Sequence, residues 1–141
     1  MNPIRLVAAL FVILAALPAL AGELSITNAW SRSTPPGVTV GVAYFTLKNH
    51  TGKSDRLLKM TTPVASKVQV HRTEILDGMA RMREVAVLHV DAGQTLEFAP
   101  NGMHLMLMGL KQPLVEGTTF EIELLFEVAG PRNVKIAVRK D

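Results

Sequence analysis

The chain has 141 residues, which is enough for one domain with a hydrophobic core and too few for two ordinary ones. Its 15 Lys and Arg residues against 12 Asp and Glu give a formal net charge of +3, too small to indicate a nucleic-acid partner. The sequence contains no cysteine, which excludes disulfides, thiolate metal ligands and a cysteine nucleophile.

The first 21 residues have the pattern of a cleaved signal peptide. Arg5 supplies a short positive start, residues 6–17 form an apolar run, and residues 19–21 are a small-residue cleavage site. The run is shorter than the roughly 20 residues that a membrane-spanning helix needs. Without cysteine, the lipid-modified lipoprotein route is closed. We therefore expect an exported, periplasmic domain over residues 22–141 that is soluble and has no stable membrane anchor.

After the signal, apolar residues recur with the two-residue period of β-strands, and Gly, Pro, Asn and Asp separate the runs. The pattern predicts strands, in chain order, over residues 24–30, 40–48, 56–61, 67–72, 81–88, 95–98, 104–110, 120–128 and 134–138. No segment has the pattern of a long helix. Short strands at this spacing are typical of a sandwich or barrel, so we predict a single all-β domain.

Methionines gather in one region of the sequence around His104. Val, Ile and Leu pack the pleated faces of a sheet better than methionine does, so core packing alone does not account for them. In the strand over 104–110, Leu105 and Leu107 mark the core side, which leaves His104 and Met106 on the other face. These two residues lie about 6.6 Å apart along the strand, so one ion can lie between their side-chain tips.

Two more residues face away from the predicted core. In the strand over 67–72, Val68 and Val70 mark the core side and His71 has the opposite parity. Met82 shares its parity with Glu84, again on the less apolar side of its strand. The sequence therefore predicts one metal site, made of His71, Met82, His104 and Met106.

The chemistry of this set favours copper(I). Two neutral imidazoles and two thioethers are soft, uncharged ligands, which suit copper(I) and suit zinc poorly. Calcium and magnesium need several oxygen ligands in a dedicated loop, which the sequence lacks, and a blue-copper site needs a cysteine sulfur. Neutral ligands also favour a carrier that hands its ion on by ligand exchange.

The spacing of the four residues resembles the copper-binding motif of the periplasmic PCu(A)C copper chaperones. Ten residues separate His71 from Met82, twenty-one separate Met82 from His104, and one separates His104 from Met106. The surrounding sequence is also similar, over residues 28–30, 35–37, 70–73, 78–83 and 101–110. The resemblance extends over nearly all of residues 22–141.

The resemblance implies a cupredoxin-like Greek-key β-sandwich that binds one copper(I) ion. It also implies delivery of copper for assembly of the copper A centre in subunit II of cytochrome c oxidase, with Sco-type thioredoxin-like copper proteins as alternative partners. We expect a monomer. This sequence lacks the His- and Met-rich C-terminal tail of some relatives, and Ala80 stands where many carry another methionine. We therefore expect neither a tail-based copper(II) site nor a spare ligand beside Met82.

The other methionines and histidines have different expected roles. Met103 has core parity, and Met108 lies on the ligand face outside the motif, as cover for the site or a contact for a partner. Met79 is either a substitute ligand or an exposed loop residue. His50 and His89 are expected at the surface.

Two further groups of residues lie outside the predicted metal site. Arg72, Arg81 and Arg83 form either a basic rim for an acidic partner or an ordinary solvated face. Trp30 and Tyr44 are expected to pack in the core.

Three other functions compete with copper delivery. A periplasmic copper buffer or resistance protein without a dedicated recipient would use the same site. An enzyme is disfavoured, because the sequence has no Gly-x-Ser-x-Gly elbow, phosphate loop or His-Glu-x-x-His motif. A metal-free structural β-sandwich is the last alternative, which copper(I) titration would separate from the others.

Overall fold

The computed structural model describes residues 22–140 of the chain. These residues form ten β-strands and no helix, and no described segment is a helix long and apolar enough to cross a membrane. The signal-peptide prediction lies outside the described residues. In chain order the strands are β1 (Leu24–Arg32), β2 (Val40–Asn49), β3 (Asp55–Thr61), β4 (Ala65–Leu76), β5 (Met79–Glu84), β6 (Leu88–Val90), β7 (Thr95–Glu97), β8 (Met103–Leu110), β9 (Thr119–Phe126) and β10 (Gly130–Arg139).

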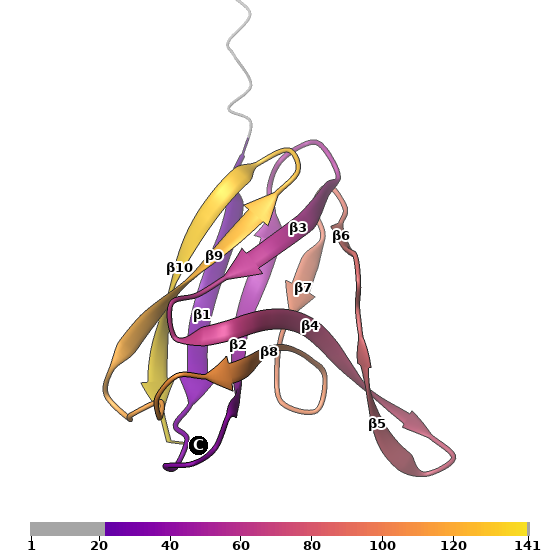
Figure 1. Ribbon diagram of the computed structural model, residues 1–141. Helices are drawn as coiled ribbons and strands as arrows, with labels where there is room; N and C mark the ends of the chain where they lie inside the picture. Colours follow the sequence, from indigo (N-terminus) through magenta and orange to yellow (C-terminus); the bar gives the residue numbers. More distant parts are fainter. Residues whose placement is uncertain (1–21, 141) are drawn as a thin grey trace, which may run out of the picture.

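The strands form one continuous hydrogen-bonded sheet that curls into two packed halves (Figure 1). The strand order is β5-β4-β8-β2-β1-β10-β9-β3-β6, and β7 also pairs with β2. β1 and β10 run parallel, whereas the other pairs of named strands are antiparallel. The predicted all-β, cupredoxin-like sandwich agrees with this architecture.

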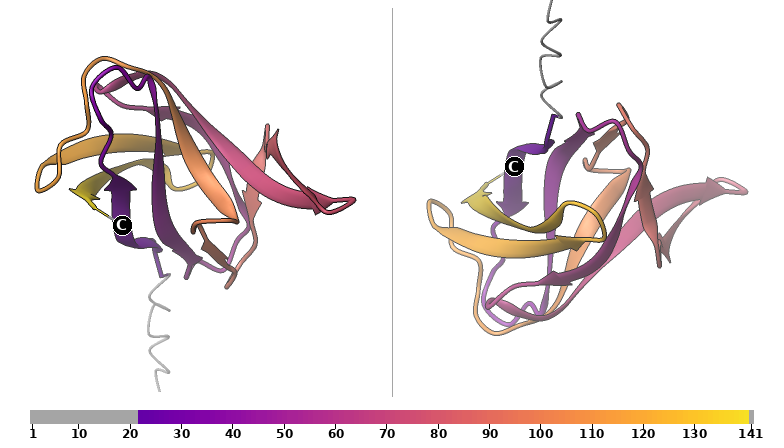
Figure 2. Two further views of the ribbon diagram at one scale, coloured as in Figure 1. Left: turned by 90° about the horizontal axis from the view of Figure 1, so that it is seen from below. Right: turned by 90° about the horizontal axis from the view of Figure 1, so that it is seen from above.

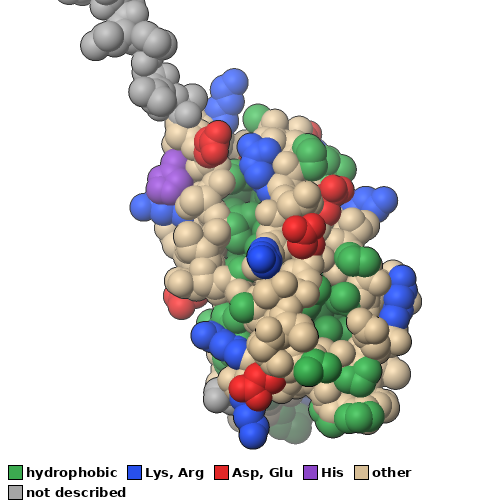
Figure 3. Space-filling view, turned by 90° about the vertical axis from the view of Figure 1, so that its left-hand side faces the viewer, with side chains coloured by type: hydrophobic (Ala, Val, Ile, Leu, Met, Phe, Trp, Pro, Cys, Tyr) green, Lys and Arg blue, Asp and Glu red, His purple; other side chains and the backbone are tan. Residues whose placement is uncertain are grey.

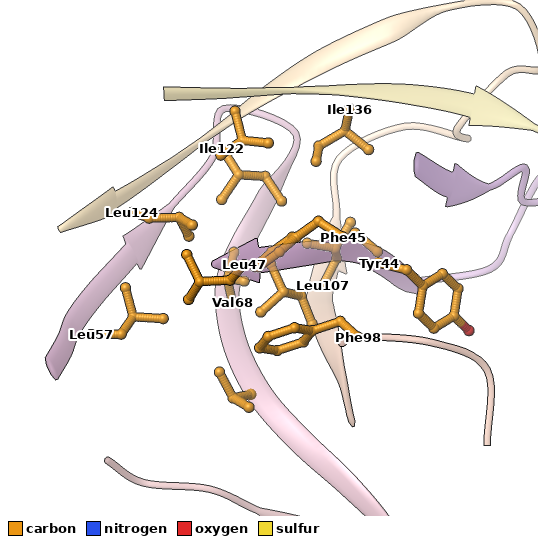
Figure 4. Close-up of a cluster of buried hydrophobic side chains, with 14 of the residues drawn as sticks. Tyr44, Phe45, Leu47, Leu57, Val68, Phe98, Leu107, Ile122, Leu124 and Ile136 are labelled. Carbon is orange, nitrogen blue, oxygen red and sulfur yellow. The ribbon is translucent and has the colours of Figure 1, made fainter. Parts of the chain in front are cut away.

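The core lies between the two halves of the curled sheet. Figure 4 shows Ile122 and Ile136 from one half facing Phe45, Leu107 and Val68 from the other. These side chains lie at alternate positions of their strands and are buried, as the two-residue period predicts. The core side of β4 and β8 is therefore the side that the sequence indicates, and the predicted ligands lie on the opposite face.

The predicted strand over residues 81–88 is wrong, because it spans two strands at opposite ends of the sheet. β5 ends at Glu84 and pairs with β4, whereas β6 begins at Leu88 and pairs with β3. Leu88 and Val90 are buried, and Ala86 and Val87 between the two strands are exposed. The alternation of residue types continues through the break although only β6 buries side chains, because every residue of β5 is exposed.

A two-residue turn joins β4 to β5 and determines their register. Asp77 and Gly78 both have positive φ, at 51° and 75°, which is the pattern of a type I′ hairpin turn. Leu76 faces Met79 across this turn, and the same register places Thr73 opposite Met82. The hairpin projects beyond the sandwich in all the ribbon views (Figures 1 and 2). The Asp-Gly turn therefore determines which residue of β4 lies opposite Met82 of β5.

Charged side chains do not gather by sign on the face away from this hairpin. Figure 3 shows that face, with basic and acidic side chains interspersed among hydrophobic ones. This distribution agrees with the small net charge of the chain.

Candidate metal centre

The two predicted histidine ligands lie side by side. His71 of β4 and His104 of β8 are direct cross-strand partners, and their ring centroids are 5.9 Å apart. Both lie on the sheet face that points away from the core, because their strand neighbours Val70 and Leu105 are buried in it. Residues that are 33 positions apart in the sequence thus come together through the pairing of β4 with β8.

His104 is buried although it does not face the core. Only 4% of its surface is exposed, whereas His71 is half-buried. An open pocket of about 320 Å³ adjoins His104, and Tyr44 of β2 and Met82 of β5 also line it. The other lining residues are Arg32, Val42, Thr73, Ala80, Pro100 and Asn101. Of the predicted ligands, His104 and Met82 therefore line a recess between the hairpin and the β2–β8 part of the sheet, whereas His71 and Met106 are not among its lining residues.

The two predicted thioethers flank the histidine pair from different strands. Met106 follows His104 by two residues on β8, lies opposite Gln69 of β4 and is half-buried. Met82 lies opposite Thr73, which makes it a diagonal neighbour of His71 across the β4–β5 pair. Met82 is 60% exposed. All four predicted ligands thus lie on one face of three adjacent strands, one of them on an exposed edge strand.

Hydrogen bonds leave one nitrogen of each histidine without a partner. His104 Nδ1 lies 3.2 Å from the Gly102 carbonyl oxygen, which can only accept, so Nδ1 carries the hydrogen. His71 Nε2 lies 3.1 Å from Gln69 Oε1, again an acceptor. Within residues 22–140, the buried side-chain atoms that lack a hydrogen-bond partner are His71 Nδ1 and His104 Nε2. Each ring therefore has a buried lone pair available as a metal ligand.

The surroundings of His71 keep its imidazole neutral. Burial lowers the pKa of His71 below its ordinary value, and the neighbouring His104 lowers it further. Glu84 opposes this effect and Lys67 adds slightly to it. Because only neutral imidazole binds a metal ion, the lowered pKa keeps the ring available to lower pH.

Most of the remaining predictions for single residues agree with the structure. Met103 is buried in the core, and His50 and His89 are exposed. Met79 is 55% exposed and lies beside the hairpin turn. Met108 is half-buried on the ligand face, opposite Val40 and Lys67.

The two aromatic residues differ from each other. Tyr44 is buried and Trp30 is half-buried. Their rings are tilted by 40° with centroids 4.7 Å apart, and the Arg139 guanidinium lies 3.9 Å from the Trp30 centroid. In Figure 4 Tyr44 lies to one side of the core cluster. Both residues therefore pack at the margin of the core.

The three arginines of the hairpin do not surround the site. Arg72 faces Arg83, and Glu74 faces Arg81, so these residues lie on the side of the hairpin opposite to His71 and Met82. Arg83 also forms an ion pair of 3.4 Å with Glu74. The interpretation as a solvated face is the one that the structure favours.

Sequence reasoning missed two residues that contact the predicted site. Gln69 bonds His71, and its amide nitrogen donates to Glu84 Oε1 at 2.8 Å. The sequence does indicate that these residues lie on the ligand face, because Gln69 is two residues from His71 and Glu84 is two residues from Met82. Their contact depends on the register of β4 and β5.

The donor set defines the chemistry of the site. Within the described part of the chain, no three His, Cys, Asp or Glu side chains gather closely enough to hold a metal ion. The predicted set adds two thioethers to the histidine pair, and a set of two imidazoles and two thioethers suits a soft monovalent ion. Fold and predicted ligands together describe a β-sandwich domain with a candidate soft-metal site of the His and Met type.

The comparisons with known proteins agree with this class. A family model described as "Putative lipoprotein LpqE-like" matches residues 24–138. Protein Lxx21020 of Leifsonia xyli subsp. xyli is 32% identical over 120 residues, which cover 84% of this chain and 71% of the relative. The chain therefore belongs to the LpqE-like family, and the resemblance to PCu(A)C proteins is confirmed.

Two solved structures extend the comparison to three dimensions. The copper(I)-bound solution structure of DR1885 from Deinococcus radiodurans has a TM-score of 0.70 and 34% identity, covering 87% of this chain and 83% of DR1885. The copper-bound PCuAC domain of PmoF2 has a TM-score of 0.72 and 23% identity, covering 86% of this chain and 96% of that domain. The likeness to PmoF2 shows a shared fold.

Proposed function

We propose that this protein is an exported copper chaperone that binds one copper(I) ion through His71, Met82, His104 and Met106. Membership of the LpqE-like family and the copper(I)-bound state of DR1885 support the proposal. We further propose that the ion is delivered for copper A assembly in subunit II of cytochrome c oxidase, directly or through a Sco-type protein. The carrier is non-catalytic and acts as a periplasmic monomer.

The observation that carries the proposal is the pair of buried, unpartnered nitrogens, His71 Nδ1 and His104 Nε2. A buried polar atom without a partner costs about 1–3 kcal/mol, and native proteins contain few of them. Two such atoms on adjacent rings indicate a shared partner, which a metal ion between them would supply. The half-buried thioether of Met106 beside them favours a soft ion.

The exposure of Met82 supports transfer rather than permanent storage. Its side chain is 60% exposed on an edge strand, whereas His104 is 4% exposed. A donor atom of an incoming protein can therefore replace the Met82 sulfur first, while the histidines still hold the ion. Ligand exchange of this kind needs no free copper ion and no redox step.

A transfer assay tests the proposal. Copper(I)-loaded protein is mixed with the apo soluble domain of subunit II, or with an apo Sco-type protein, and copper in each is measured after separation. We expect copper to move to one of them. Binding without transfer to either would support a copper buffer, and absence of copper(I) binding would contradict the whole proposal. Met82→Ala should change the transfer rate, and Met79→Ala, an exposed methionine on the same strand, should not.

A further inference from the structure

The ring of His71 is fixed by a chain of side-chain hydrogen bonds. His71 Nε2 lies 3.1 Å from Gln69 Oε1, and Gln69 Nε2 donates to Glu84 Oε1 at 2.8 Å. The Glu84 carboxylate can only accept, so the Gln69 amide must direct its NH₂ group to Glu84 and its oxygen to His71. The oxygen in turn requires a hydrogen on His71 Nε2. Glu84 thus determines, through Gln69, which nitrogen of His71 has the free lone pair.

The two histidines differ in what holds them. His104 donates from Nδ1 to the main-chain carbonyl of Gly102, a bond that needs no particular side chain. His71 depends on two side chains from two strands. The register of the β4–β5 hairpin places Glu84 directly opposite His71, and Gln69 precedes His71 by two residues on the same face of β4. The hairpin that carries Met82 thus also carries the residue that orients His71.

We propose that Gln69 and Glu84 are positioning residues that hold His71 with its Nδ1 lone pair directed to copper(I). The proposal rests on the proposed function, because copper is the ion that this lone pair would bind. It assigns the ligand atoms as His71 Nδ1 and His104 Nε2. Partners of this kind orient metal-binding histidines, and their loss typically costs about 10–100-fold in metal affinity.

The first test uses the apo protein and needs no copper. Nitrogen-15 NMR of the imidazoles should show a hydrogen on His71 Nε2 that exchanges slowly with water, and one on His104 Nδ1. In Gln69→Leu, which keeps the volume and removes the acceptor, exchange of the His71 hydrogen should become much faster. Unchanged exchange in this variant would overturn the proposal.

The second test uses copper(I), which is diamagnetic and leaves the NMR signals visible. In loaded wild type the hydrogen should remain on His71 Nε2, and Gln69→Leu should lower copper(I) affinity about 10–100-fold in a competition titration. The double variant Gln69→Glu with Glu84→Gln exchanges donor and acceptor, preserves the charge and should restore most of the affinity. A copper-loaded His71 with its hydrogen on Nδ1, or full affinity in Gln69→Leu, would contradict the assignment.

A matched control separates this role from general effects of charge. Glu74→Gln removes a carboxylate from the opposite face of β4 and should change neither the His71 hydrogen nor copper affinity. If wild type bound no copper(I), the proposed function would fail. The apo measurement on Gln69→Leu would still decide whether Gln69 orients His71.

Discussion

The candidate site joins two regions of unlike character, the buried strand β8 and the exposed hairpin of β4 and β5. β8 supplies His104 and Met106 from between β4 and β2, whereas every residue of β5, including Met82, is exposed. Side chains on a central strand are held by packing on both sides, and those on an edge strand are not. Under the proposed function, this difference makes Met82 on β5 the ligand accessible for exchange, while the ligands of the more buried strands hold the ion.

The largest effect should come from removing the buried ligand. We expect His104→Ala to lower copper(I) affinity by more than about a hundredfold, beyond the loss typical of residues that only orient a ligand. Truncating this buried side chain also leaves the Gly102 carbonyl with only the Thr73 N–H as a donor, so the free energy of unfolding should fall by about 1–3 kcal/mol. Competition titration and denaturant unfolding measure the two quantities. His89→Ala, an exposed histidine, is the control and should change neither.

Removing either thioether should lower copper(I) affinity, but only the loss of Met106 should clearly lower the stability of the apo protein. We expect Met82→Ala and Met106→Ala each to reduce copper(I) affinity by about tenfold, a loss of about 1.4 kcal/mol. Met106 is half-buried, so its loss should also destabilise the apo protein, by about 1 kcal/mol. Met82 is exposed and its loss should leave the stability within about 0.5 kcal/mol. Equal destabilisation by the two variants would contradict the contrast between β8 and the hairpin.

The pH dependence of the apo protein follows from His71. Its pKa is lower in the folded than in the unfolded chain, so the unfolded state takes up a proton first as the pH falls. Stability should therefore be full above the unfolded pKa of about 6.5, decline below it, and level off below the folded pKa. Unfolding of wild type and His71→Gln between pH 5 and 8 measures this contribution. An equal decline in both would show that His71 does not cause it.

The smallest effect should come from the hairpin turn. Gly78 has a φ of 75° with open space around it, so Gly78→Ala should cause backbone strain of about 1 kcal/mol without a steric clash. We expect faster amide exchange in β5 and a copper affinity reduced less than in Met82→Ala. Gly52→Ala, which also meets open space but has no positive φ, is the control. An affinity loss as large as that of Met82→Ala would show that copper binding requires a rigid hairpin, which would contradict the contrast between β8 and the hairpin.

Much of the fold and of the candidate site could be predicted from the sequence. Alternation around Val70 and Leu105 indicates the core side of β4 and β8, because burial in a sandwich follows the two-residue period. That alternation is a local property. It therefore predicts correctly which way His71 and His104 point.

The sequence could not predict which strands pair or in what register. His71 meets His104 because β4 and β8, separated by three other strands in the chain, are neighbours in the sheet. The break between Glu84 and Leu88 has the same cause, since β5 and β6 pair at opposite ends of the sheet. The contact between Gln69 and Glu84 also follows from pairing. Side-chain contacts across strands depend on the tertiary structure, so alternation alone does not predict them.

The most direct measurement is X-ray absorption spectroscopy of the copper(I)-loaded protein beside its Met82→Ala and Met106→Ala variants. If imidazoles and thioethers from β4, β5 and β8 share one ion, wild type should show two nitrogen and two sulfur neighbours of a single copper, and each variant should lose one sulfur. A copper ion with only nitrogen or oxygen neighbours, or a sulfur signal unchanged in both variants, would contradict the account.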